Sequence, residues 1–122
     1  MFKARKYKVK SDFMISVAAG KWSIRAGGAV LGETKKALEL YEGDNKPSLY
    51  FPKKDLAMAF FERTAHEIIH PHKGIMGYYS IVTKSQTLEN IAWEFIAPRP
   101  EVMDLVDYVS FASTSAITIE RL

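Results

Sequence analysis

The sequence has 122 residues and no cysteine. Without thiols, the chain can form neither a disulfide scaffold nor an iron–sulfur cluster, and it has no thiolate nucleophile or thiolate zinc ligand. It also has no apolar run near the roughly 18 residues that a membrane span requires. We therefore expect no membrane partner and a fold stabilised by its hydrophobic core.

The chain also lacks a large excess of charge of one sign, because it has 17 basic and 14 acidic side chains. The imbalance is local, because five basic residues precede the first acid, Asp12: Lys3, Arg5, Lys6, Lys8 and Lys10. Such an arm can bind phosphates by releasing counterions, or it can be a solvated terminus. No nucleic-acid-binding motif accompanies it, so nucleic acid is not expected as a partner.

The length predicts one domain. We place a basic arm and leading segment at residues 1–20 and a single domain at 21–122. The apolar segment 13–19 is at the short limit of about 7 residues for the core of a signal peptide, and Asp12 stands at its entry. We interpret it as part of the mature protein, and we expect a cytoplasmic location.

Most of the chain has the composition or alternation typical of β-strands. The expected strands are 22–26, 29–33, 37–41, 49–51, 75–83, 88–95, 108–111 and 117–119. Gly27 and Gly28 suit a two-residue turn between the first two. Residues 101–106 predict a turn or two of helix after Pro98 and Pro100. The pattern indicates a mainly β domain with minor helix.

One segment, 56–70, departs from this pattern. Its composition favours a helix, and its apolar residues recur near helical spacing, at 56, 60, 61, 65, 68 and 69. Local rules alone predict a helix here.

The same segment contains His66-Glu67-Ile68-Ile69-His70, which fits the H-E-x-x-H pattern of zinc peptidases. On a helix, His66 and His70 would share one face and could bind Zn²⁺, with Glu67 as the base acting on a metal-bound water. However, Pro71 disfavours helical geometry at His70. On a strand, His66, His70 and His72 could line one face, where metal binding would be adventitious. No cofactor is predicted, and zinc at these histidines stays open.

Several blocks of the sequence, taken in order, resemble one family. These blocks are Gly27-Gly28-x-Val30, Glu33-Thr34-Lys35-Lys36-Ala37-Leu38, Tyr50-Phe51-Pro52-x-x-Asp55-Leu56, Pro71-x-Lys73-Gly74 with Tyr78-Tyr79-Ser80, Ala92-Trp93, Pro98-x-Pro100-Glu101 and Tyr108-Val109-x-Phe111. From about residue 22 to 111 the chain is similar to the domain of unknown function 427 family, which belongs to the beta-tent group of folds.

The resemblance implies a small, mainly β domain of two antiparallel sheets that meet at an angle, with little helix. It therefore replaces the helix over 56–70 by a strand at 57–62 and an extended or loop segment at 66–70. The sequence departs from the family pattern at four positions: His70 stands where Cys is typical, His72 where Tyr is frequent, Asn90 where Asp is usual and Phe95 where Tyr is common.

The candidate ligand-binding residues are Lys73, Tyr78, Tyr50, His70 and Trp93. Lys73 would supply a positive charge for a carboxylate or phosphate, next to a flexible Gly74. The aromatic residues would form apolar walls with polar edges. Glu33 or Asp55 would orient the lysine. Each of these residues also has an ordinary structural explanation, such as packing in a sheet or capping a turn.

We therefore expect a small cytoplasmic β-rich domain that binds an unknown small molecule or protein in a cleft around Lys73, and no catalytic residue is assigned. The alternative is a hydrolase or transferase, with a histidine as general base or with a metal held through His66-Glu67-x-x-His70. An exposed strand edge makes a dimer possible.

Overall fold

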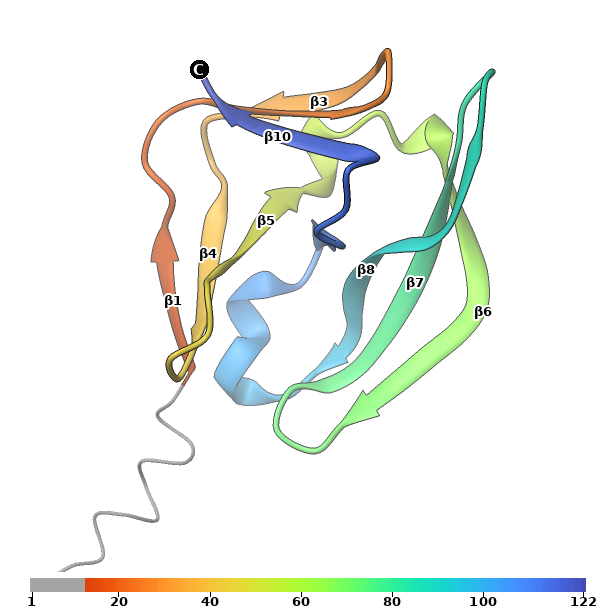
Figure 1. The fold of residues 1–122 in the computed structure, drawn as a ribbon. Helices are drawn as coiled ribbons and strands as arrows, with labels where there is room; N and C mark the ends of the chain where they lie inside the picture. The colour runs from red at the N-terminus through yellow and green to blue at the C-terminus, as the bar shows by residue number, and fades with distance from the viewer. Residues whose placement is uncertain (1–12) are drawn as a thin grey trace, which may run out of the picture.

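The computed structural model describes residues 13–122 (Figure 1). This part of the chain forms ten strands and three short 3₁₀ helices. The strands are β1 (Phe13–Val17), β2 (Trp22–Ala26), β3 (Ala29–Thr34), β4 (Leu38–Glu42), β5 (Ser48–Pro52), β6 (Phe61–His70), β7 (Gly74–Val82), β8 (Thr87–Pro98), β9 (Tyr108–Phe111) and β10 (Ile117–Arg121). The helices are η1 (Lys53–Asp55), η2 (Met58–Phe60) and η3 (Pro100–Leu105).

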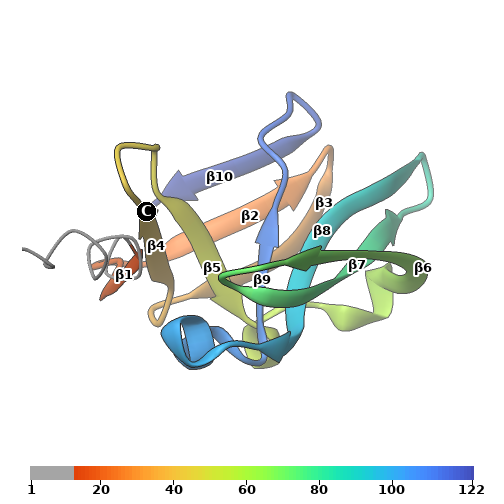
Figure 2. The ribbon, with the colours of Figure 1, turned by 90° about the horizontal axis from the view of Figure 1, so that it is seen from below.

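The strands build two antiparallel sheets, which confirms the predicted mainly β fold with two sheets. The large sheet has the order β1-β4-β5-β9-β8-β7-β6, and the small sheet has the order β10-β2-β3. The small sheet runs across one end of the large one (Figure 1), and its three strands lie side by side (Figure 2). The expected β2–β3 hairpin is present, and Gly27 takes the positive φ of 60° that its turn requires.

Each face of the large sheet has its own hydrophobic cluster. The first cluster joins the two sheets, and includes Ile24 and Leu31 of the small sheet with Phe51 and Val109 of the large one. The second cluster lies on the other face, where Val102 and Leu105 of η3 pack against the large sheet. Side chains alternate between faces along a strand, so neighbouring residues of β5, β7 and β8 contribute to different clusters.

The small sheet docks onto the segment after β5 through close backbone contact. Gly32 forms a bridge with Leu56, and the Ala57 N–H donates to the Leu31 carbonyl at 2.7 Å. A Cβ at Gly32 would collide with the backbone carbonyl of Asp55. The absence of a side chain at Gly32 is therefore what allows this approach.

The large sheet begins earlier than the predicted domain boundary at residue 21. β1 pairs with β4 along its whole length, from Phe13 opposite Glu42 to Val17 opposite Leu38. The leading segment is therefore part of the sheet from residue 13 onwards. The predicted basic arm at Lys3 to Lys10 lies outside the described residues.

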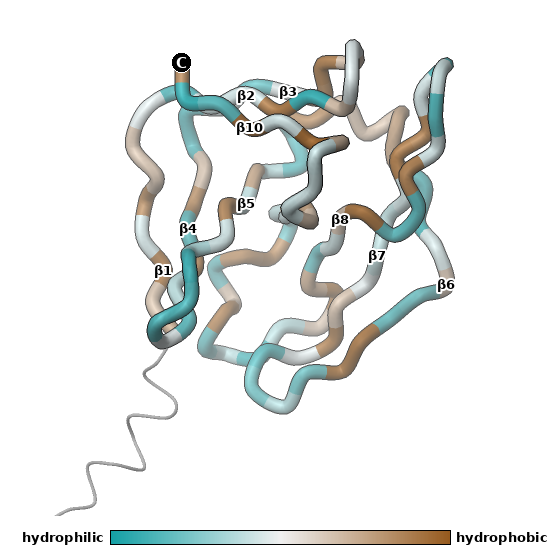
Figure 3. The backbone as a smooth tube through the Cα atoms, viewed as in Figure 1, coloured by the Kyte–Doolittle hydropathy of each residue, from teal (hydrophilic) through white to brown (hydrophobic). Residues whose placement is uncertain are grey.

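The helix that local rules predict over 56–70 is wrong. Residues 61–70 form β6, which pairs with β7 from Phe61 opposite Ile81 to His70 opposite Gly74, with a register shift between Arg63 and Glu67. The apolar spacing that resembled a helix places Phe61 in the core but leaves Ile68 and Ile69 exposed, and Figure 3 shows a hydrophobic stretch in this half of β6. None of the helices within residues 13–122 is long and apolar enough to cross a membrane.

Candidate functional site

Four aromatic side chains from four strands meet on one face of the large sheet. Tyr78 and Trp93 lie opposite each other in the β7–β8 register, with ring centroids 5.9 Å apart. The Trp93 indole N–H donates to the Tyr50 hydroxyl at 3.2 Å. On the other side, the His66 ring lies 4.6 Å from the Tyr78 ring. We call Tyr50, Trp93, Tyr78 and His66 the aromatic row.

The aromatic row runs from the core to the surface. Tyr50 is buried and stacks on Phe95, Trp93 and Tyr78 are half-buried, and His66 is exposed. Burial raises the pKa of Tyr50; the hydrogen bond with Trp93 opposes this in part, whereas the Glu42 carboxylate and Tyr78 add to it, so this hydroxyl stays protonated at neutral pH. Its hydrogen bond fixes the indole of Trp93 while leaving part of the ring accessible.

Lys73 lies in the turn between β6 and β7 and pairs with a residue on a distant strand. Its Nζ is 2.9 Å from Oε1 of Glu42, at the end of β4, and the Lys73 side chain is only 12 % exposed. Gly74 makes this turn possible, because it has φ of 103° and a Cβ there would collide with the Ala97 carbonyl oxygen. The charge that the sequence predicted for an anionic ligand is therefore already compensated by Glu42.

His70 lies beside this ion pair. Its Nδ1 accepts a hydrogen bond from the His72 backbone N–H at 3.1 Å, and its ring faces Phe13 of β1. Burial and the Lys73 ammonium lower the pKa of His70, and Glu42 opposes them in part. The neutral imidazole is favoured, with its proton on Nε2.

The five predicted ligand-binding residues therefore lie in two connected groups: Tyr50, Tyr78 and Trp93 in the aromatic row, and Lys73 and His70 at the neighbouring end of the sheet. Glu42 connects them, since it pairs with Lys73 and raises the pKa of Tyr50. The other two residues considered for orienting Lys73 have different partners. Glu33 pairs with Lys21, and Asp55 accepts a hydrogen bond from Thr34 at 2.7 Å.

The strand geometry of β6 changes the interpretation of the histidines. His66 and His70 are four residues apart on a strand, which separates them by about 13 Å rather than placing them one helical turn apart. In zinc peptidases the two histidines of this motif lie one helical turn apart, so that both can bind the same metal ion. Within residues 13–122, no three His, Asp or Glu side chains are grouped so that they could hold a metal ion.

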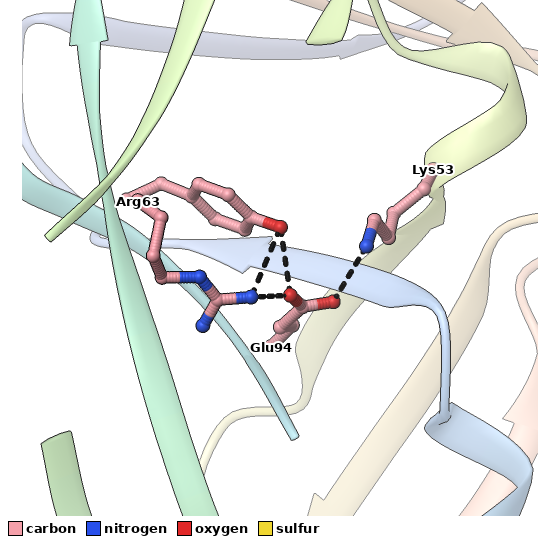
Figure 4. A network of polar contacts seen from close by, with 4 residues as sticks. Lys53, Arg63 and Glu94 are labelled. Carbon is pink, nitrogen blue, oxygen red and sulfur yellow. Dashed lines mark hydrogen bonds and ion pairs between the residues drawn. The ribbon is translucent and has the colours of Figure 1, made fainter. Parts of the chain in front are cut away.

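A second polar group lies on the opposite face of the large sheet, and sequence reasoning missed it (Figure 4). Glu94 of β8 is 4 % exposed, and both of its carboxylate oxygens have partners. Oε1 is 3.1 Å from Lys53 Nζ, and Oε2 accepts hydrogen bonds from Arg63 and, at 2.7 Å, from the Tyr79 hydroxyl. We call Glu94, Lys53, Arg63 and Tyr79 the Glu94 network.

The electrostatics of the Glu94 network favour the charged ammonium of Lys53 and the protonated hydroxyl of Tyr79. Burial lowers the pKa of Lys53, but the hydrogen bond and charge of Glu94 outweigh this effect, so the pKa is raised. Burial and the Glu94 carboxylate raise the pKa of Tyr79. The Arg63 guanidinium lies 4.5 Å above the Tyr79 ring, which adds a cation–π contact. Because its buried oxygens are satisfied, the Glu94 network ties η1, β6, β7 and β8 together.

The sequence matches the model of a known protein family over most of its length. The model of the family described as "Domain of unknown function (DUF427)" matches residues 14–121. The chain belongs to the DUF427 family. The match in this DUF427 protein runs from β1 into β10, so it covers both sheets, the aromatic row and the Glu94 network. No curated protein matches the chain.

Proposed function

We propose that this DUF427 protein is a binding domain that takes a flat, ring-containing small molecule on the aromatic row. The observation that carries the proposal is the partly exposed Trp93 ring, which Tyr50 fixes by a hydrogen bond and Tyr78 flanks, with His66 on the far side of Tyr78. Aromatic side chains with restricted rotamers bind planar rings at a small entropic cost, and each stacked base contributes about 1–3 kcal/mol in known complexes.

The charges around the row favour an uncharged ligand. Lys73 is mostly buried and paired with Glu42, so it has little free charge for a phosphate or carboxylate. The neighbouring His70 is neutral at physiological pH because its pKa is lowered. Lys73 then acts by fixing Glu42 and the β6–β7 turn rather than by contacting an anion.

The proposal is tested with adenosine, a neutral ring-containing probe, and with AMP, which adds a phosphate. In a Trp22→Phe background, Trp93 is the one tryptophan, so its fluorescence reports on the row. We expect saturable quenching by adenosine, and a Kd that rises by about tenfold in Tyr78→Ala. AMP should bind within about threefold of adenosine because Lys73 is already paired.

Tyr41→Ala is the matched control, since Tyr41 lies on β4 and its hydroxyl contacts Glu39 rather than the row. This variant should leave the Kd unchanged. Quenching that does not saturate, or an equal loss in both tyrosine variants, would contradict the proposed function. AMP binding tenfold tighter than adenosine would contradict the uncharged ligand class.

A further inference from the structure

A cavity of about 480 Å³ lies away from the aromatic row, between the start of β5, the end of β9 and β10. It forms where the chain leaves the large sheet at Phe111 and crosses through residues 112–116 to the small sheet. Both sheets therefore line it. Its volume is within the range of sites that hold small organic ligands.

The inner wall of this cavity is continuous with the first hydrophobic cluster. Phe111 belongs to that cluster, and Leu49, Ile117 and Ile119 pack against it while remaining half-buried. Apolar atoms placed here would cover side chains that the two sheets leave partly open. This wall favours a ligand with an apolar body.

The outer wall is polar and carries a positive charge. Lys46 and the hydroxyl-bearing Ser113 and Thr114 line it, and none of the lining residues is acidic. Within the part of the chain that the structure describes, Lys46 has no ion-pair partner. Ser110 is engaged, because its hydroxyl donates to the Leu49 carbonyl at 3.0 Å. Lys46 therefore offers an uncompensated charge at the rim of an apolar cavity.

We propose that this cavity binds a small organic monocarboxylate with an aromatic or branched aliphatic body. The body contacts Phe111, Ile117 and Ile119, and the carboxylate pairs with Lys46 at the rim. This site is separate from the one under Proposed function, since none of the residues that line the cavity belongs to the aromatic row.

The probes that test this site are 3-phenylpropionate and its neutral amide, 3-phenylpropionamide, which share a body and differ in charge. In ¹H–¹⁵N correlation spectra of the full chain, we expect saturable shifts at the amides of 48–49, 110–114 and 117–119. The amide should bind about fivefold more weakly than the acid. Lys46→Gln should weaken acid binding by the same factor and leave amide binding unchanged.

Lys35→Gln is the matched control, because Lys35 is an exposed lysine that does not line the cavity. It should leave both affinities unchanged, and so should Tyr78→Ala, whose effect belongs to the aromatic row. Shifts confined to the aromatic row, or no saturable shifts up to 10 mM probe, would overturn the cavity as a ligand site. Equal binding of acid and amide would overturn the carboxylate assignment.

Discussion

At the scale of single residues, His70 shows how its surroundings set the protonation of a side chain. Burial and Lys73 lower its pKa, whereas Glu42 raises it. In an NMR titration, the His70 ring should therefore have a midpoint below 6.5, the value of an unperturbed histidine. Lys73→Gln should raise this midpoint because a like charge is removed, and Glu42→Gln should lower it because an opposite charge is removed.

The control for this titration is Lys84→Gln, which removes a lysine from the turn between β7 and β8. Its effect on the His70 midpoint should be negligible, since screening weakens interactions between exposed charges beyond about 10 Å. A midpoint above 6.5 in the unmodified chain would contradict the arrangement of Lys73 and His70 described above.

The Glu94 network is also a residue-scale feature, because one carboxylate holds three partners. Glu94→Gln keeps the shape of the side chain but removes the charge between Lys53 and Arg63. Since both cations are partly exposed, we expect a loss of about 2 kcal/mol in the free energy of unfolding rather than the larger cost of a fully buried pair.

Urea denaturation followed by circular dichroism measures this loss. Glu89→Gln on the same strand is the control, because Glu89 is exposed and has no ion-pair partner among residues 13–122. It should change the free energy of unfolding by less than about 0.5 kcal/mol. Equal effects of the two substitutions would mean that the Glu94 network does not stabilise the fold.

At the scale of elements, the approach of β3 to the segment after β5 depends on Gly32. Gly32→Ala forces a Cβ against the Asp55 carbonyl, so β3 must move away from Leu56. We expect a loss of about 1–3 kcal/mol in the free energy of unfolding, as in other overpacked sites. Thermal or urea denaturation measures it.

Gly28→Ala is the matched control on the same hairpin, because a Cβ at Gly28 meets no atom within 4 Å. It should leave the free energy of unfolding nearly unchanged. A Gly32→Ala variant as stable as Gly28→Ala would show that the two sheets are not held at this point.

Sequence patterns predicted the elements that depend on local turns, and they failed where distant pairing decides the outcome. The Gly27-Gly28 turn is a local signal, and the β2–β3 hairpin that it predicts is present. Segment 56–70 has a helical spacing of apolar residues, but β6 forms because β7 offers it a partner strand. The family resemblance predicted an extended segment here, because it carries information on long-range pairing that local propensity lacks. It placed the strand at 57–62, however, whereas η2 occupies Met58–Phe60 and β6 begins at Phe61.

The candidate site shows the same division. The five predicted ligand-binding residues lie in two connected groups, but Glu42, which connects these groups, was missed because it is 31 residues from Lys73 in the sequence. Glu94 was missed for a similar reason, as its partner Arg63 is also 31 residues away. One signal in the sequence could have pointed to Glu94: it is a charged residue in the otherwise apolar stretch Ala92-Trp93-Glu94-Phe95.

At the scale of the whole molecule, the two hydrophobic clusters share the strands of the large sheet, so we expect them to unfold together. Trp22 packs against the first cluster and Trp93 against the second. In urea, the fluorescence midpoint of Trp22→Phe and that of Trp93→Phe should each coincide with the midpoint by circular dichroism of the same variant. Separate midpoints within one variant would mean that the clusters unfold independently.

The pairing of β10 with β2 has a consequence for synthesis on the ribosome. Ile117 pairs with Ala26, so about 90 residues must be added before the small sheet can be completed. At roughly 5–20 residues per second, a nascent chain spends about 5–20 s with one edge of β2 unpaired. During translation, that edge of β2 can pair with a wrong strand, because its correct partner, β10, is the last strand to be synthesised.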